Sequence, residues 1–173
     1  LVLPHRDGGQ SVICWNDSEQ SFTQTTAFGP ATANCRTGNI GDLNQDGWLD
    51  FVAGDQNEGV LIYLNENGTL NKARQFKYQG KRPYSIALAD MNQDGNLDIV
   101  VGYASTEPND STAMGRVILL PDNIEDEQEN IVIVPFAITA GAIYGLALGD
   151  VNADGFIDIV AARSGGNNAL FLN

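Results

Sequence analysis

The stretch YSIALADMNQDGNLDIVVG, residues 84–102, places an oxygen-rich loop between two short apolar runs. The run before the loop alternates small and apolar residues, whereas the run after it is rich in β-branched residues. Short runs of this kind, bounded by Gly, Asn and Asp, are typical of β-strands. The loop is therefore expected to join two neighbouring strands.

This strand–loop–strand unit is repeated along the chain. Loops of the form D-x-N-x-D-G-x-x-D start at Asp42, Asp90 and Asp150, which are 48 and 60 residues apart. The N-terminal stretch HRDGGQSVICWN (5–16) also aligns without a gap with the C-terminal stretch ARSGGNNALFLN (162–173). Self-similarity at a period of about 50 residues indicates a repeat architecture.

The repeat predicts the fold. Each period holds four predicted strands, and fourteen strands can be counted in the chain. No segment shows a convincing helical period, and a four-stranded unit of this length predicts an all-β fold of antiparallel β-propeller blades. We expect one partial propeller over residues 1–173, about 3.5 blades long, with blades at 1–33 (incomplete), 34–81, 82–141 and 142–173 (incomplete).

The two incomplete blades have a consequence for assembly. By this count the first blade lacks its inner strand and the last blade lacks its outer strand. Closed propellers usually have four to eight blades, and an open arc leaves apolar faces and strand edges uncovered. We therefore expect either further blades of a longer propeller or self-association to close the ring.

Composition excludes several classes of partner. The chain has 173 residues, is 43% hydrophobic and contains no apolar run long enough to span a membrane. Its net charge of −13 repels nucleic acid and anionic lipid, so neither nucleic-acid binding nor membrane insertion is expected. Nine of the 22 acidic residues are the aspartates of the three loops, which suggests bound cations as counter-ions.

The chain starts at Leu1 rather than at a methionine, so a signal peptide could have been removed, or the sequence could be a piece of a longer one. Cys14 and Cys35 are either one disulfide bridge, which requires an oxidising compartment, or two small buried residues.

The acidic loops have the composition of a calcium site. Oxygen side chains at positions 1, 3, 5 and 9 suit Ca²⁺, which takes six to eight oxygen ligands, and Gly at position 6 permits a sharp turn. Without a cation, aspartates packed this closely would repel one another. Mg²⁺ keeps more of its waters, and the absence of Cys and His from the loops argues against zinc. The alternative is an Asx-rich turn without a metal, which three matching copies make a poor explanation.

The EF-hand starts with the same pattern but has flanking helices and a bidentate Glu at position 12. Position 12 is Ala53, Val101 or Ala161 here, within β-branched runs. The closing carboxylate is therefore expected from position 9, in a loop that joins strands.

Residues 84–102 resemble the FG-GAP repeat of integrin α-subunit propellers and the related bacterial VCBS-type repeat, and the likeness extends through the chain. The resemblance implies about three Ca²⁺ ions, each bound by the side chains of positions 1, 3, 5 and 9 and by the backbone carbonyl of position 7. The implied ligands are Asp42, Asn44, Asp46, Trp48 and Asp50 in the first loop, Asp90, Asn92, Asp94, Asn96 and Asp98 in the second, and Asp150, Asn152, Asp154, Phe156 and Asp158 in the third.

The chain departs from the integrin pattern outside the loops. The expected Phe-Gly pair is Lys81-Arg82 before Tyr84, and it is also absent before Arg36 and Tyr144. These departures favour the bacterial type and argue against an integrin-like partner.

We expect a non-enzymatic calcium-binding module that acts in adhesion or in recognition of a glycan or protein ligand, in a secreted, cell-surface or periplasmic protein. Arg36, Tyr84 and Tyr144 precede their loops by six residues and should cluster at the end of the channel opposite the cations. They are candidate ligand contacts, with channel packing as the alternative.

Two other functions are compatible with the sequence. A structural spacer would need no ligand of its own. A calcium-dependent polysaccharide lyase, or a non-catalytic part of one, is the runner-up among enzymes. The chain offers few candidate catalytic residues for a lyase, because its one histidine, His5, is expected to cap a turn. Trp15 is expected either to stack on a sugar or to pack between blades.

Overall fold

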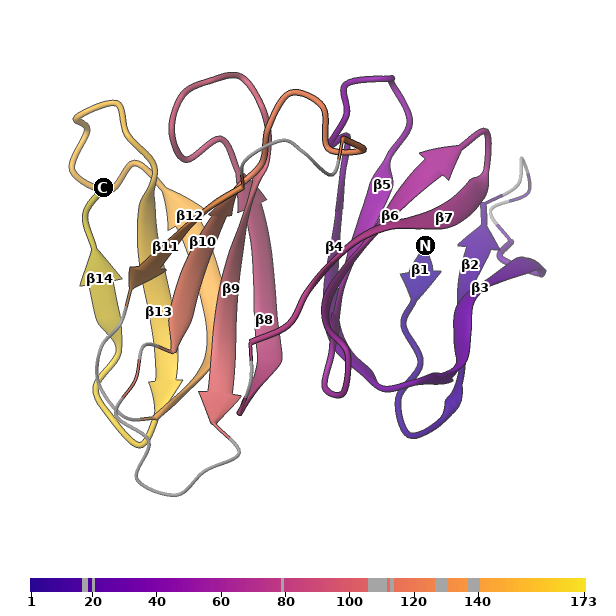
Figure 1. Cartoon of the computed structure of the whole chain (residues 1–173), viewed down its shortest axis with the longest axis horizontal. Helices are drawn as coiled ribbons and strands as arrows, with labels where there is room; N and C mark the ends of the chain where they lie inside the picture. Colours follow the sequence, from indigo (N-terminus) through magenta and orange to yellow (C-terminus); the bar gives the residue numbers. More distant parts are fainter. Residues whose placement is uncertain are drawn as a thin grey trace.

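The computed structural model describes residues 1–16, 19, 21–78, 80–105, 112, 114–126, 131–136 and 141–173. Every regular element within these residues is a β-strand, which confirms the all-β prediction. The described residues form fourteen strands in four antiparallel sheets of three, four, four and three strands. Figure 1 shows these sheets side by side across the molecule, with β1–β3 at the right and β12–β14 at the left.

We name the sheets blades 1 to 4 in chain order. Blade 1 has the order β1-β2-β3, from β1 (Val2–Leu3), β2 (Gly9–Trp15) and β3 (Gln24–Ala33). Blade 2 has the order β4-β5-β6-β7, from β4 (Cys35–Gly41), β5 (Asp50–Asp55), β6 (Gly59–Glu66) and β7 (Thr69–Phe76). Blade 3 has the order β8-β9-β10-β11, from β8 (Lys81–Ala89), β9 (Asp98–Ser105), β10 (Gly115–Leu119) and β11 (Val132–Phe136). Blade 4 has the order β12-β13-β14, from β12 (Ala142–Gly149), β13 (Asp158–Ser164) and β14 (Ala169–Phe171).

The acidic loops all lie at one end of the blades. They join β4 to β5, β8 to β9 and β12 to β13, and Figure 1 shows them along the top of the molecule. The inner strands β4, β8 and β12 run toward these loops, so the first residues of these strands lie at the opposite end. The two ends of the arc can therefore carry different chemistry.

Apolar side chains fill the spaces between neighbouring blades. Between blades 2 and 3, for example, the fully buried Ile62 and Val101 belong to one cluster of buried side chains. A second cluster joins blades 1 and 2 and contains Phe28 and Phe51, whose rings meet edge to face at 5.5 Å. Further clusters join blades 3 and 4. Each blade is thus stabilised mainly by burial against the next.

One repeated position shows where this packing stops. Val52 and Val100 are the second residues after the Asp that ends their acidic loops, and both are completely buried. Their counterpart in blade 4, Val160, is 40% exposed. The same residue type in the same strand differs in burial because blade 4 has no further blade packed on its outer face among the described residues.

Each inner strand contains a β-bulge near its start. The pairing shifts between Cys35 and Thr37 in β4, between Pro83 and Ser85 in β8, and between Ile143 and Gly145 in β12. The residues left out of the ladder are Arg36, Tyr84 and Tyr144. A bulge bends its strand and turns the side chain of the extra residue in a new direction.

Candidate metal centres

The three acidic loops have one backbone conformation. The fourth residue of each loop has a positive φ, and so does the glycine at the sixth position. The values are 59°, 62° and 61° at Gln45, Gln93 and Ala153, and 88°, 93° and 92° at Gly47, Gly95 and Gly155. Because Gln and Ala rarely adopt this region, the turn is imposed by the rest of the loop.

The first aspartate of each loop holds the turn together. In the first loop, the backbone N–H groups of Asp46 and Gly47 donate to the two carboxylate oxygens of Asp42, at 3.1 Å and 3.0 Å. The corresponding bonds to Asp90 and Asp150 have lengths of 3.1 Å and 2.9 Å in both loops. This carboxylate is therefore aimed into its own loop.

The third and fifth positions are also linked. The side-chain amide of Asn44 donates to Asp46 Oδ2 at 3.0 Å, and the N–H of Trp48 donates to Asp46 Oδ1 at 2.8 Å. The same pair of bonds occurs in the second loop and in the third. Side-chain oxygens from positions 1, 3 and 5 are thus gathered by the loop's own backbone.

The ninth aspartate has a role that sequence reasoning missed. Asp50, Asp98 and Asp158 are completely buried. Asp98 accepts one hydrogen bond from the N–H of Met91 at 2.8 Å and another from the N–H of Leu120 at 2.9 Å. Asp50 bonds in the same way to Leu43 and Asn65, and Asp158 to Val151 and Asn173.

These bonds tie each acidic loop to the end of the third strand of its blade. The repeated Leu-Asn pairs at 64–65 and 172–173 were the sequence feature that could have indicated the contact. A carboxylate that anchors backbone in this way stabilises the blade whether or not a cation is bound.

The surroundings of the ninth aspartate shift its pKa. Burial raises the pKa of Asp98, and the nearby Asp94 and Asp90 carboxylates raise it further, against the lowering effect of the two backbone N–H donors. The pKa of Asp50 is raised for the same reasons. The pKa of Asp158 is instead lowered, chiefly by the N–H of Asn173 and then by that of Val151, which together outweigh the effect of desolvation.

Neighbouring loops are connected through the fourth position. The side-chain amide of Gln45 donates to Asn96 Oδ1 at 2.6 Å and to the Gly95 carbonyl at 3.2 Å. That of Gln93 donates to the Gly155 carbonyl at 2.7 Å. The first loop therefore contacts the second, and the second contacts the third. Ala153 at the fourth position of the third loop has no amide to continue the series.

The donor set of each loop fits a hard cation. Its side chains at positions 1, 3, 5 and 9 all carry oxygen, and a backbone carbonyl at position 7 completes a set of the kind that Ca²⁺ prefers. Within the part of the chain that the structure describes, however, no three Asp, Glu, His or Cys side chains form a group that could hold a metal by themselves. The loop carboxylates bond to backbone N–H groups instead. The two exposed aromatic residues of the set, Trp48 and Phe156, would contribute only their carbonyls.

The opposite end of the arc brings together the three bulge residues, as predicted. The Arg36 guanidinium lies 3.9 Å from the centre of the Tyr84 ring and 5.7 Å from that of Tyr144. The two tyrosine rings are 5.0 Å apart. They line an open hollow of about 460 Å³ together with Pro4, Arg6 and Cys35.

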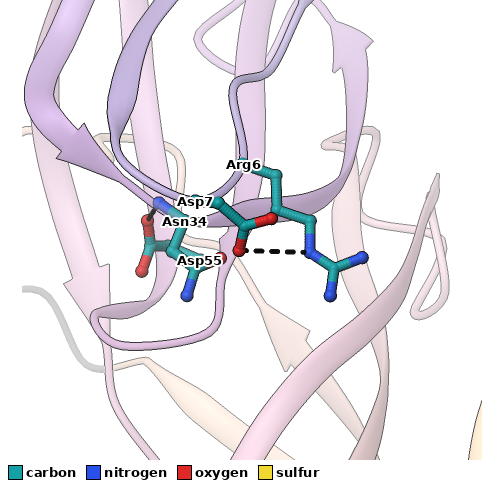
Figure 2. Close-up of polar contacts among 4 residues, drawn as sticks. All are labelled: Arg6, Asp7, Asn34 and Asp55. Atoms are coloured by element: carbon teal, nitrogen blue, oxygen red, sulfur yellow. Dashed lines mark hydrogen bonds and ion pairs between the residues drawn. The ribbon is translucent and has the colours of Figure 1, made fainter.

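Both cysteines are buried as free thiols, so of the two alternatives the structure has the small buried residues rather than the bridge. Burial raises the pKa of Cys35 to about 12, helped by the Asp55 carboxylate, which accepts a bond from Sγ at 3.7 Å. Asp55 also accepts a hydrogen bond of 2.7 Å from the N–H of Asn34 (Figure 2).

Consecutive antiparallel sheets packed face to face, each with an acidic loop after its inner strand, define a segment of a β-propeller. A comparison with protein families matches residues 42–101 to the FG-GAP-like repeat. Residues 42–101 thus carry the FG-GAP-like repeat that the sequence predicted, and the similarity to integrin α subunits supports it. The closer relation to VCBS-type repeats stays a prediction.

Among individual proteins, the chain is similar to integrin α subunits. It is 33% identical over 75 residues to integrin alpha-6 of Homo sapiens, covering 35% of this chain and 7% of that protein. It is 32% identical over 94 residues to integrin alpha-PS5 of Drosophila melanogaster, covering 51% and 9%. With integrin alpha-6 of Gallus gallus, the identity is 37% over 116 residues, covering 59% and 10%. The chain thus spans about a tenth of the length of these relatives.

In the described residues, no helix is both long and apolar enough to cross a membrane.

Proposed function

We propose that this chain is a calcium-binding β-propeller module of a cell-surface or secreted protein, and that it acts in adhesion or ligand recognition. The observation that carries this proposal is the threefold recurrence of one loop conformation around the same oxygen side chains. Similarity to integrin α subunits, which are cell-surface proteins, supports an extracellular location. No catalytic activity is expected of the module.

The residues that would hold the ion are those implied by the resemblance. In the second loop they are the side chains of Asp90, Asn92, Asp94 and Asp98 and the carbonyl of Asn96. Bound Ca²⁺ would supply positive charge among carboxylates that otherwise repel one another. The loop would supply a turn already shaped by its backbone bonds to Asp90. The first and third loops would act in the same way.

Calcium would therefore stabilise the fold directly and would affect ligand recognition through that stabilisation. A site with a Kd about a hundredfold below the free Ca²⁺ concentration stabilises the fold by about 2.7 kcal/mol. Ions at the ends of three inner strands would fix these strands relative to their blades. The strand starts at the opposite end, where the candidate ligand contacts lie, would be held in turn.

The test is a melting curve with calcium and with a chelator. Calcium should raise the Tm of the intact chain, and Asp94→Ala should lose part of that increase. Glu125→Gln, which removes an exposed charge outside the three loops, is the matched control and should keep all of it. Melting curves that coincide in calcium and in chelator would refute the proposal.

The exposed faces of the outer blades support a second part of the proposal, that further blades or a second copy close the ring. Val160 is 40% exposed although its counterparts are fully buried. Light scattering on the chain should then give a mass above 18.5 kDa if copies complete the ring, and the mass of a monomer if more blades are required.

A further inference from the structure

We propose that the hollow at the end of the arc opposite the acidic loops binds the carboxylate of an acidic sugar, with Arg36 as the cationic contact and Tyr144 as the stacking surface. This deepens the proposed recognition function and rests on it. It names a site and a class of ligand, an acidic glycan.

The backbone singles out these residues. Arg36, Tyr84 and Tyr144 are the three residues that the β-bulges of β4, β8 and β12 leave outside the ladder. Three blades thus use the same irregularity at the same place, and the resulting side chains meet. Bulges are common beside binding sites because they redirect a side chain without breaking the sheet.

The packing of Arg36 leaves it ready to bind. Its guanidinium stacks on the face of Tyr84, with its carbon 3.9 Å from the ring centre. Stacking covers the face of the guanidinium but leaves the N–H groups on its edge available, and this edge matches a carboxylate in a bidentate pair. The tyrosine rings also hold the side chain in place, so binding a carboxylate would cost less conformational entropy.

Arg36 has no acidic partner among the residues that the structure describes. The other arginine of the hollow, Arg6, does have one: its Nε lies 3.7 Å from Asp7 Oδ1 (Figure 2). Those two side chains are 55% and 79% exposed, so this ion pair is weak and Asp7 neutralises the charge of Arg6 only in part. In a chain of net charge −13, a cation without a carboxylate partner, in a hollow with a second arginine, favours an anionic ligand.

The tyrosines favour a sugar over an acidic peptide. Tyr144 is 50% exposed, and a ring that is half open can pack against the C–H face of a pyranose while its hydroxyl bonds to water or ligand. The hollow is open and has a volume of about 460 Å³, which is in the range of small-ligand sites. A carboxylate on the pyranose could reach the edge of the Arg36 guanidinium while the C–H face of the sugar covers Tyr144.

The experiment is calorimetric titration of the whole chain, in calcium, with an oligosaccharide of alternating glucuronate and N-acetylglucosamine. The intact chain should bind it, and the same oligosaccharide with its carboxyls methyl-esterified should bind at least about tenfold more weakly. Equal binding of the ester would overturn the role of the carboxylate. Tighter binding of hexaglutamate than of the oligosaccharide would overturn the choice of a glycan.

Variants test the residues. Arg36→Gln should weaken binding about tenfold or more. Arg36→Lys should weaken it less, because lysine keeps the positive charge but lacks the planar guanidinium that pairs with both carboxylate oxygens. Tyr144→Ala should weaken binding several-fold. Arg82→Gln is the control, because it removes one charge from an exposed side chain near the start of β8 that does not line the hollow. This variant should bind the oligosaccharide as tightly as the intact chain does.

The inference and the proposed function can fail separately. A calcium-dependent rise in Tm measured on the same samples reports the acidic loops, and a retained Tm of Arg36→Gln shows that the variant is folded. If calcium raises the Tm but the oligosaccharide does not bind, or binds Arg36→Gln equally well, this inference is wrong and the calcium module stands. If calcium has no effect, the proposed function fails whatever the sugar does.

Discussion

Replacing Asp98 by alanine should destabilise the chain even when no calcium is present. Asp98 is fully buried and is the acceptor for the N–H groups of Met91 and Leu120. Its loss leaves two buried donors without an acceptor, at about 1–3 kcal/mol each. Burial also raises the pKa of Asp98, so removing the carboxylate relieves some desolvation cost and offsets part of this loss.

The net expectation is a loss of about 2–4 kcal/mol, which in a domain of this size lowers the Tm by roughly 5–15 °C. The assay is urea unfolding and thermal melting in excess chelator. Asp94→Ala is the matched control, because Asp94 is exposed and bonds only within its loop. In chelator it should cost less than about 1 kcal/mol.

In calcium the two variants should both lose stability. An Asp98→Ala chain as stable in chelator as the unmodified chain would refute the anchoring role of the ninth aspartate. Equal losses for both variants in chelator would refute the claim that Asp98 anchors the blade whereas Asp94 acts only within its loop.

Three further predictions follow from the same structure. Because burial raises the pKa of Cys35 from 9.0 to about 12 and that of Tyr63 from 10.0 to about 12, both groups bind protons more tightly in the folded chain. Their contribution to stability is therefore complete below pH 9 and is lost as the pH rises toward 12. The urea midpoint should fall over that range, and it should fall less in Cys35→Ala. An unchanged midpoint from pH 8 to 11 would contradict it. Val100→Ala should cost about 2–3 kcal/mol of unfolding free energy and Val160→Ala less than about 1, as measured by urea unfolding, and equal costs would show that blade 4 is covered. Gln93→Ala removes the bond from the second loop to the third and should weaken calcium binding about threefold by calorimetry, whereas identical isotherms would mean that the loops act independently.

The fold was largely predictable because its information is local and repeated. The loop motif and the runs on either side of it give strand order within a blade, and three copies fix the period. The clustering of Arg36, Tyr84 and Tyr144 also followed from one spacing, since residues at equivalent positions of inner strands meet around a propeller axis. In a regular repeat, the position of a residue within its repeat therefore indicates where that residue lies in the structure.

What could not be predicted depends on register and on contacts between repeats. The bulges at the three inner strands need one extra residue opposite the second strand, and neither hydrophobic pattern nor loop spacing reveals this. The anchoring bonds of Asp98 were missed because its partner Leu120 lies just after a different strand, β10, and donates a backbone N–H, which almost any residue type can do.

Single residues outside the repeat were also harder to assign. His5 was expected to cap a turn; its backbone N–H donates to Ser11 Oγ at 3.1 Å, and its ring lies directly over Gly9, where a Cβ would collide with it. Trp15 is partly exposed, and its indole N–H donates to Thr26 Oγ1 at 2.9 Å. Their counterparts in the last blade, Ala162 and Leu172, are different residue types without a ring nitrogen, so the repeat could not indicate these contacts.

The most direct test of the account is the number of calcium ions bound per chain, measured by equilibrium dialysis followed by metal analysis. The account predicts three ions, one for each loop, and the loss of one ion in each of Asp42→Ala, Asp90→Ala and Asp150→Ala. A chain that retains no calcium after dialysis against a millimolar concentration, or that keeps the same number of ions in all three variants, would contradict it.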